Sequence, residues 1–159
     1  MSALPRDELT FRTMQLADLD PIVSVEAQCY VVPWTRGNFV DSLAAGYEAR
    51  VLRGAAGELQ AYFIAMPGFE ELHLLNITVA PAYQGRGLAL CMLDELRRLC
   101  GLHGAHKIWL EVRISNERAR AIYRRHGFAE VGVRRGYYPM PQGGPREDAV
   151  LMSLEVSTS

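Results

Sequence analysis

The spacing of apolar residues changes along the chain, and each change predicts a different element. A first helix is predicted directly after Asp18, because apolar residues recur there at helical spacing: Leu19, Ile22, Val23 and Cys29. Asp18 can cap this helix. A second, short helix is expected over residues 36–45. Strand-like runs bounded by glycine-containing turns follow at 49–52, 60–66 and 72–79. This part of the chain is typical of an antiparallel meander.

From Leu88 the apolar residues again recur at helical spacing, which predicts an amphipathic helix that closes near Gly101. Residues 107–112 alternate between apolar and polar side chains, as in a central strand. Ser115 or Asn116 can cap a further helix, ended by Gly127 in a left-handed conformation. Two final strands, near 128–134 and 149–154, flank a loop rich in glycine and proline. The order predicts an α/β or α+β fold with a mixed sheet and helices on both faces.

Composition narrows the class of protein further. The 159 residues, 49% of them apolar, fit one domain over 1–159 with a single core. A net charge of −1 gives no basic field, so direct nucleic-acid binding is not expected. No run approaches the roughly 20 apolar residues of a membrane helix, and residues 1–10 lack the order of a signal peptide. A cytosolic location without membrane association is therefore expected.

The cysteines and histidines give no metal-site pattern. The three cysteines form no C-x-x-C pair and are expected to be buried, reduced thiols: Cys29, Cys91 and Cys100. The four histidines are scattered, and no H-E-x-x-H helix brings two of them onto one face. His103 and His106 stand beside glycines, which favours a loop. No metal is expected.

The most informative segment is 76–89, where an apolar strand runs through a glycine-containing turn into the long helix. Such a junction points unpaired backbone N–H groups and the positive end of the helix dipole at one place, which suits a pyrophosphate. Gly85 and Gly87 let the main chain approach the anion, and Arg86 can add a positive charge. A Walker loop would need Gly-Lys-Ser/Thr, and a dinucleotide fingerprint would need a glycine at Leu90; neither is present.

The remaining pattern, Gln84-x-x-Gly87-x-Ala89, resembles the coenzyme A loop of the GNAT acetyltransferases. The predicted Asn116 helix and the segment 123–128 match the family's order, and the resemblance covers about residues 10–155. It implies a seven-stranded, mostly antiparallel sheet with a splay between the fourth and fifth strands. It also implies acetyl-CoA as co-substrate. The resemblance places the pyrophosphate of the coenzyme on the loop and helix start: Gln84, Gly85, Arg86, Gly87, Leu88 and Ala89. It places the pantetheine arm against Asn116 and against the strand backbone of Ile77, Thr78 and Val79.

Four segments resemble the RimI-type ribosomal-protein-alanine N-acetyltransferases in particular: 32–34, 109–116, 134–139 and 146–149. That resemblance implies acetylation of the N-terminal alanine of a small-subunit ribosomal protein. The sequence departs from the type at Ala89, where many members have glycine, and at Val32, where an aromatic residue is common. The loop 140–145 is also slightly long, which bears on the preferred peptide.

The chemistry needs a base, because a terminal amine with a pKa of about 8 is only about a tenth neutral at pH 7. Strand alternation turns Glu111 away from the apolar face of Leu110 and Val112, so Glu111 is the expected base, directly or through a water; the resemblance assigns it the same role. By resemblance, Tyr123 protonates the departing coenzyme A thiolate. Three loop aromatics either border the acceptor groove or cap the core: Trp34, Tyr137 and Tyr138.

Other functions remain open at this point. A GNAT protein acting on lysine side chains or a small amine would share every coenzyme-binding residue. A non-catalytic acetyl-CoA sensor would keep the fold but has no need of Glu111 and Tyr123. The expected assembly is a monomer, although the sequence carries no signal for its oligomeric state.

Overall fold

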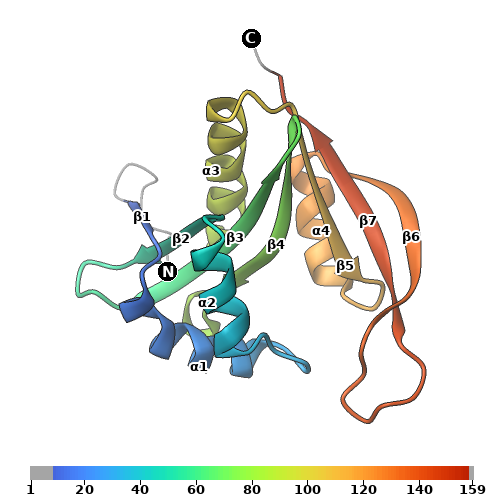
Figure 1. The fold of residues 1–159 in the computed structure, drawn as a ribbon, viewed down its shortest axis with the longest axis horizontal. Coiled ribbons are helices and arrows are strands. Elements are labelled where there is room, and N and C mark those ends of the chain that lie inside the picture. The colour runs from blue at the N-terminus through green and yellow to red at the C-terminus, as the bar shows by residue number, and fades with distance from the viewer. Residues whose placement is uncertain (1–8, 158–159) are drawn as a thin grey trace. The chain divides into compact units, whose positions relative to one another are not determined.

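The computed structural model describes residues 9–157, and within them seven strands form one sheet in the order β1-β2-β3-β4-β5-β7-β6. The elements follow the chain as β1 (Phe11–Thr13), α1 (Leu19–Cys29), α2 (Arg36–Ala44), β2 (Glu48–Arg53), β3 (Leu59–Gly68), β4 (Glu71–Val79), α3 (Leu88–Leu102), β5 (Lys107–Arg113), α4 (Glu117–His126), β6 (Ala129–Tyr138) and β7 (Glu147–Glu155) (Figure 1). Short 3-10 helices precede α1 (Leu16–Asp18) and α3 (Pro81–Tyr83). The predicted mixed, mostly antiparallel seven-stranded sheet is confirmed.

The chain groups into two compact units. Of the described residues, the first comprises 9–65 together with Asn76–Met92. Here β2 pairs antiparallel with both β1 and β3, as a meander requires. Its fully buried side chains include Ile22 of α1, Phe39 of α2 and Tyr62 of β3, and the last two rings meet edge to face at 6.0 Å.

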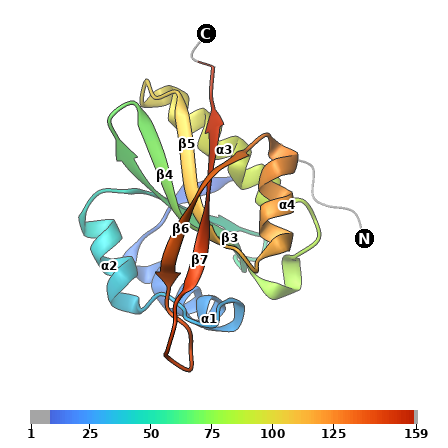
Figure 2. The same ribbon diagram turned by 90° about the vertical axis from the view of Figure 1, so that its right-hand side faces the viewer.

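The second unit comprises Met66–Leu75 together with residues 93–157. In it β7 pairs antiparallel with β5 on one side and with β6 on the other, and the loop joining β6 and β7 extends beyond the ends of both strands (Figure 2). Helix α4 begins at the predicted cap Asn116 and ends at Gly127, whose φ of 116° is left-handed as predicted.

The parallel pair β4–β5 opens along its length. Pairing runs from Glu71 opposite Lys107 to Leu74 opposite Leu110 and stops there, although β4 continues to Val79 and β5 to Arg113. The unpaired ends leave backbone groups that need other partners. This is the splay expected between the fourth and fifth strands.

Two local expectations are wrong. Asp18 does not cap α1 through its side chain, because that carboxylate accepts a hydrogen bond from the backbone N–H of Gln15 and pairs with Arg53. Of the three free thiols only Cys100 is buried, whereas Cys29 and Cys91 are half-buried. The loop position predicted for His103 and His106 is confirmed, since both follow the end of α3.

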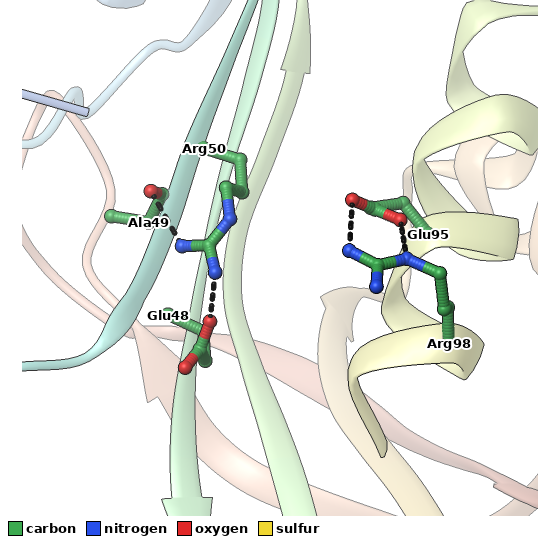
Figure 3. A network of polar contacts seen from close by, with 5 residues as sticks. All are labelled: Glu48, Ala49, Arg50, Glu95 and Arg98. Carbon is green, nitrogen blue, oxygen red and sulfur yellow. Dashed lines mark hydrogen bonds and ion pairs between the residues drawn. The ribbon is translucent and has the colours of Figure 1, made fainter. Parts of the chain in front are cut away.

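Several charged side chains are satisfied by neighbours within their own element. On β2, Arg50 donates to the carbonyl oxygen of Ala49 at 3.0 Å and pairs with Glu48; on α3, Arg98 forms a two-point contact with Glu95 at 2.6 and 3.0 Å (Figure 3). The arginine of the Arg98–Glu95 pair is 58% exposed, and exposed pairs of this kind are typically worth only about 0–1 kcal/mol.

Two features that residues 9–157 lack bear on the kind of site to expect. Helices long and apolar enough to cross a bilayer do not occur in this part of the chain. Nor do three or more His, Cys, Asp or Glu side chains gather there as a metal ion would require.

Candidate active site

The loop before α3 has the backbone geometry of an anion cradle. Gly85 and Gly87 have φ values of 81° and 80°, a left-handed conformation that favours glycine. A Cβ built on either glycine would meet nothing within 4 Å, so the space over the loop is open. The side-chain amide of Gln84 donates to the carbonyl oxygen of Val79 at 3.1 Å, which ties the loop to the end of β4.

The start of α3 supplies donors for the same site. Cys91 donates the first backbone hydrogen bond of the helix to Gly87 at 3.1 Å, so the amides of Leu88, Ala89 and Leu90 precede it and have no partner within the helix. The guanidinium of Arg86 lies 5.4 Å from the ring centre of Tyr83. The structure thus brings together the predicted loop residues, and they fit a pyrophosphate: Gln84, Gly85, Arg86, Gly87, Leu88 and Ala89.

The end of β4 is fixed by hydrogen bonds to neighbouring side chains. The Tyr30 hydroxyl donates to the carbonyl oxygen of Ile77 at 2.8 Å and lies 2.7 Å from the Thr78 hydroxyl. The Cys29 thiol contacts the carbonyl oxygen of Val79 at 3.8 Å. The Val79 carbonyl oxygen therefore accepts from both Gln84 and Cys29, which holds the end of β4 on two sides. Nothing in the sequence indicated that Tyr30 holds this strand, because its contacts with Ile77 and Thr78 join residues far apart in the chain.

A buried carboxylate, that of Glu26, contacts the strand β4 through Asn76. Glu26 of α1 is 2% exposed and accepts hydrogen bonds from the Tyr62 hydroxyl at 2.7 Å, the Asn76 side chain at 3.1 Å and the backbone N–H of Trp34 at 3.0 Å. Three donors are what a buried carboxylate requires. The ring of Trp34 also packs on Phe39, 5.2 Å between centres, so this aromatic is held by the core.

In the second unit, Glu111 lies on β5 with only 4% of its side chain exposed. Its Oε1 atom is 2.8 Å from Nε2 of His73 on β4, and its Oε2 atom is 3.6 Å from Arg134 on β6. The contact with His73 has the distance of an ion pair but not the alignment of a hydrogen bond, so Oε1 has no aligned donor. A buried oxygen in that state can accept a proton from a bound molecule.

Opposing effects set the charge of Glu111. Burial raises the pKa of this carboxyl, but the contact with His73, a hydrogen bond from Tyr137 and the charge of Arg134 outweigh it, so the pKa lies below its usual range. Glu111 is therefore a carboxylate at neutral pH. Burial and the neighbouring carboxylate raise the pKa of Tyr137 to about 12, which keeps that hydroxyl a donor.

The expectation that Tyr137 and Tyr138 lie in a loop is wrong, because β6 continues to Tyr138, which pairs with Glu147 of β7. Their rings meet edge to face at 4.8 Å, with Arg134 over Tyr137 at 4.9 Å and Arg113 over Tyr138 at 4.7 Å. Arg113 also donates to Glu147 at 3.0 Å and to the carbonyl oxygen of Pro139 at 2.9 Å. The base of the β6–β7 loop is therefore firmly placed.

The remaining predicted residues lie on α4. Tyr123 is 8% exposed and packs near Phe128, with 5.7 Å between ring centres. Burial, then the carboxylate of Glu111 and the neighbouring tyrosines, raises the pKa of Tyr138 well above its ordinary value. Asn116 is exposed and its side chain accepts from the backbone N–H of Ala119 at 3.1 Å, so its capping role is in place.

Comparison with known proteins identifies this arrangement. Residues 19–128 match the acetyltransferase (GNAT) family, and the chain belongs to that family of acetyl-transferring enzymes. It is 34% identical over 148 residues to the [ribosomal protein bS18]-alanine N-acetyltransferase of Escherichia coli strain K12, covering 93% of this chain and 98% of the relative. A putative enzyme of the same name from Bacillus subtilis is 29% identical over 147 residues, 92% of this chain and 95% of the relative.

Solved structures agree with the family. The crystal structure of the ribosomal-protein-S18-alanine N-acetyltransferase from Escherichia coli superposes with a TM-score of 0.84 and 33% identity, over 95% of this chain and 96% of that one. The spermidine N-acetyltransferase from Vibrio cholerae, solved in complex with CoA and spermine, has a TM-score of 0.79 at 20% identity, over 96% of this chain and 98% of that one. The second likeness shows the GNAT fold alone.

Proposed function

We propose that this chain transfers the acetyl group of acetyl-CoA to the N-terminal α-amine of an alanine that begins a small-subunit ribosomal protein. The observation that carries the proposal is the buried carboxylate of Glu111, with one oxygen that has no aligned donor. A pure binding module has no use for such a base. Relatives about one-third identical over most of the chain are named [ribosomal protein bS18]-alanine N-acetyltransferase, which supports an alanine acceptor on a ribosomal protein.

The chain's contribution to coenzyme binding is mainly backbone. The open glycine loop and the unpaired amides that begin α3 would hold the pyrophosphate, with Arg86 as the nearby cation. Main-chain groups of Ile77, Thr78 and Val79 would hold the pantetheine arm, and Asn116 would add a contact from α4. When bound, acetyl-CoA supplies the thioester carbonyl that the amine attacks.

The proton of the acceptor amine is the main chemical obstacle. At pH 7 about nine-tenths of a terminal amine is protonated and cannot attack. Glu111 would take that proton, directly or through one water, because its carboxylate is buried and its Oε1 atom has no aligned donor. Tyr123 would return a proton to the coenzyme A thiolate. Trp34, Tyr137 and Tyr138 would border the acceptor peptide.

The proposal extends to the compartment and the assembly in which the enzyme acts. The chain would act as one domain over residues 1–159, as a cytosolic monomer without nucleic acid, membrane or metal. An acceptor that emerges as a free protein N-terminus during synthesis is available in that compartment.

The acceptor that the enzyme prefers separates the proposed N-terminal activity from transfer to lysine side chains or to a small amine. The test compares two peptides of the same ribosomal-protein N-terminal sequence, one with a free alanine amine and one with that amine formylated and an internal lysine added. Release of coenzyme A with the first and not with the second supports the proposal. Equal or faster turnover of the blocked peptide, or of spermidine, contradicts it and favours a lysine- or amine-directed enzyme.

A further inference from the structure

The end of α1 contacts the last residues of β4 at two points. The hydroxyl of Tyr30, the residue that follows the helix, donates to the carbonyl oxygen of Ile77 at 2.8 Å. The thiol of Cys29, the last residue of the helix, lies 3.8 Å from the carbonyl oxygen of Val79. All four residues belong to the first unit. Helix α1 therefore holds the backbone of the segment along which the pantetheine arm would lie.

The two contacted oxygens leave β4 on the edge that faces away from β3. The backbone N–H of Ala80 donates to the carbonyl oxygen of Gln60 on β3 at 2.8 Å, and backbone groups of successive strand residues point to opposite edges. Ile77 and Val79 therefore present their backbone groups on the other edge. The oxygens of this edge are held by protein side chains, while its N–H groups point to the same side and can donate to a ligand.

A chain of hydrogen bonds connects the Tyr30 hydroxyl to the buried carboxylate of Glu26. The side-chain amide of Asn76 donates to Oε1 of Glu26 at 3.1 Å, so its oxygen faces the other way and accepts from the Thr78 hydroxyl at 2.8 Å. Because the Thr78 hydrogen is engaged there, Tyr30 is the donor in its 2.7 Å contact with the Thr78 hydroxyl. The Tyr30 hydrogen is thus shared between Thr78 and Ile77, as a three-centre bond.

The carboxylate at the end of this chain sets its direction. Every donor points toward Glu26, which also accepts from the Tyr62 hydroxyl at 2.7 Å, and donors aligned in this way strengthen one another. The inner members are shielded from water, since Glu26, Asn76 and Thr78 are 2%, 8% and 3% exposed. Tyr30 is 36% exposed, yet its oxygen is fixed from the interior of the unit.

We infer that Tyr30 is a positioning residue of the acetyl transfer, which fixes the end of β4 so that the thioester lies in one place in each turnover. This inference rests on the proposed function and deepens it, because it adds a residue that acts through the backbone of Ile77. A displacement of about 1 Å in a bound reactant can cost about 10²-fold in rate. A strand end that is held less tightly should therefore slow the transfer.

Tyr30→Phe tests this role, because it removes the hydroxyl and keeps the ring. We expect kcat on the alanine peptide to fall about 5- to 20-fold, with KM for acetyl-CoA nearly unchanged, since the glycine loop holds the pyrophosphate. The matched control is Tyr47→Phe, a tyrosine of the same unit between α2 and β2. A role confined to stability lowers Tm and leaves kcat unchanged at temperatures well below Tm. That result overturns the inference.

The pH dependence separates positioning from proton transfer. Tyr30→Phe should lose the same factor in kcat from pH 7 to pH 9, because a bond that holds the backbone delivers no proton in the reaction. The loss in Glu111→Gln should instead shrink over this range, as the free amine fraction grows. A loss in Tyr30→Phe that disappears as the pH rises makes the hydroxyl part of the proton pathway and contradicts the positioning role.

Glu26→Gln tests whether the buried carboxylate acts through Tyr30. The new amide replaces one acceptor oxygen by an NH₂ group, so a donor of the network loses its partner. We expect kcat to fall, and the double variant with Tyr30→Phe to be about as slow as the slower single variant, because members of one network are not additive. Losses that multiply contradict the connection. If Glu26→Gln does not fold, Tyr30→Phe still decides the role of Tyr30.

A further measurement does not depend on the acceptor. In infrared spectra of bound acetyl-CoA labelled with ¹³C at the acetyl carbonyl, the thioester band should be narrow in the wild type and in Tyr47→Phe. It should be broader in Tyr30→Phe, because the thioester is less well placed. Equal widths in all three proteins overturn the inference. If the wild type fails to acetylate the alanine peptide, the proposed acceptor is wrong, and this spectrum still decides whether Tyr30 positions the coenzyme.

Discussion

Replacement of Gly87 by leucine tests the coenzyme loop with a known structural cost. Gly87 has a φ of 80°, and a residue with a Cβ in that conformation loses about 1–2 kcal/mol. A Cβ at this position meets nothing within 4 Å, so the first side-chain atom adds no clash. For a chain of this size, 1 kcal/mol corresponds to about 2–4 °C in Tm, and the variant should melt about 2–8 °C below the wild type.

The chain offers a matched control in Gly57→Leu. Gly57 has a φ of 85° and equally open surroundings, but it lies in the turn between β2 and β3. Both variants should therefore show a similar loss of stability without ligand. Any difference between them in the presence of acetyl-CoA belongs to the loop and not to the backbone strain.

The assay is thermal unfolding with and without acetyl-CoA. At 100 times Kd a ligand stabilises the native state by about 2.7 kcal/mol, which for this chain is about 5–11 °C. The wild type and Gly57→Leu should show that shift. Gly87→Leu should lose most of it, because the side chain occupies the space through which the pyrophosphate reaches the backbone. A full shift in Gly87→Leu refutes the assignment of this loop.

Three further predictions concern the ligand, the base and acid stability. Acetyl-CoA should raise Tm while NAD and ATP at equal concentration do not; an equal shift with ATP alone contradicts coenzyme A binding. Glu111→Gln should lower turnover about 10²- to 10⁴-fold at pH 7 and regain part of it at higher pH, with acetyl-CoA affinity nearly unchanged; wild-type turnover from pH 6.5 to 9 makes Glu111 structural. The free energy of unfolding, measured by urea denaturation, should fall as the pH drops below about 4.5, because the folded pKa values of Glu111 and Glu147 are lowered and their contribution is lost as they protonate. If Glu111→Gln flattens none of this fall, the shift at that carboxyl does not exist.

Much of the fold could be predicted from sequence because it depends on local signals. The predicted strand 72–79 corresponds to β4, and the helix predicted from Leu88 corresponds to α3. Gly127 ends α4 in a left-handed backbone conformation, which glycine adopts without the steric cost of a Cβ. The short strand β1 escaped prediction, since the three residues Phe11–Thr13 are too few to show an alternation.

The candidate site could be predicted only where its residues act through local geometry. The glycine loop is a local feature, and alternation alone turned Glu111 away from the apolar face of β5. His73 could not be placed, because its contact with Glu111 depends on the register of a parallel pair whose partner residues are 36 positions apart in sequence. Glu26 has the same limitation: its donors come from β3, β4 and a loop.

The central claim is that this enzyme acetylates the N-terminal alanine of a ribosomal protein, and the intact mass of that protein tests it most directly. Small-subunit proteins from a strain without the gene should include a bS18 chain about 42 Da lighter than in the parent, the mass of one acetyl group. Expression of the wild-type enzyme should restore that mass, and Glu111→Gln should restore little of it. An unchanged bS18 mass in the deletion strain contradicts the claim.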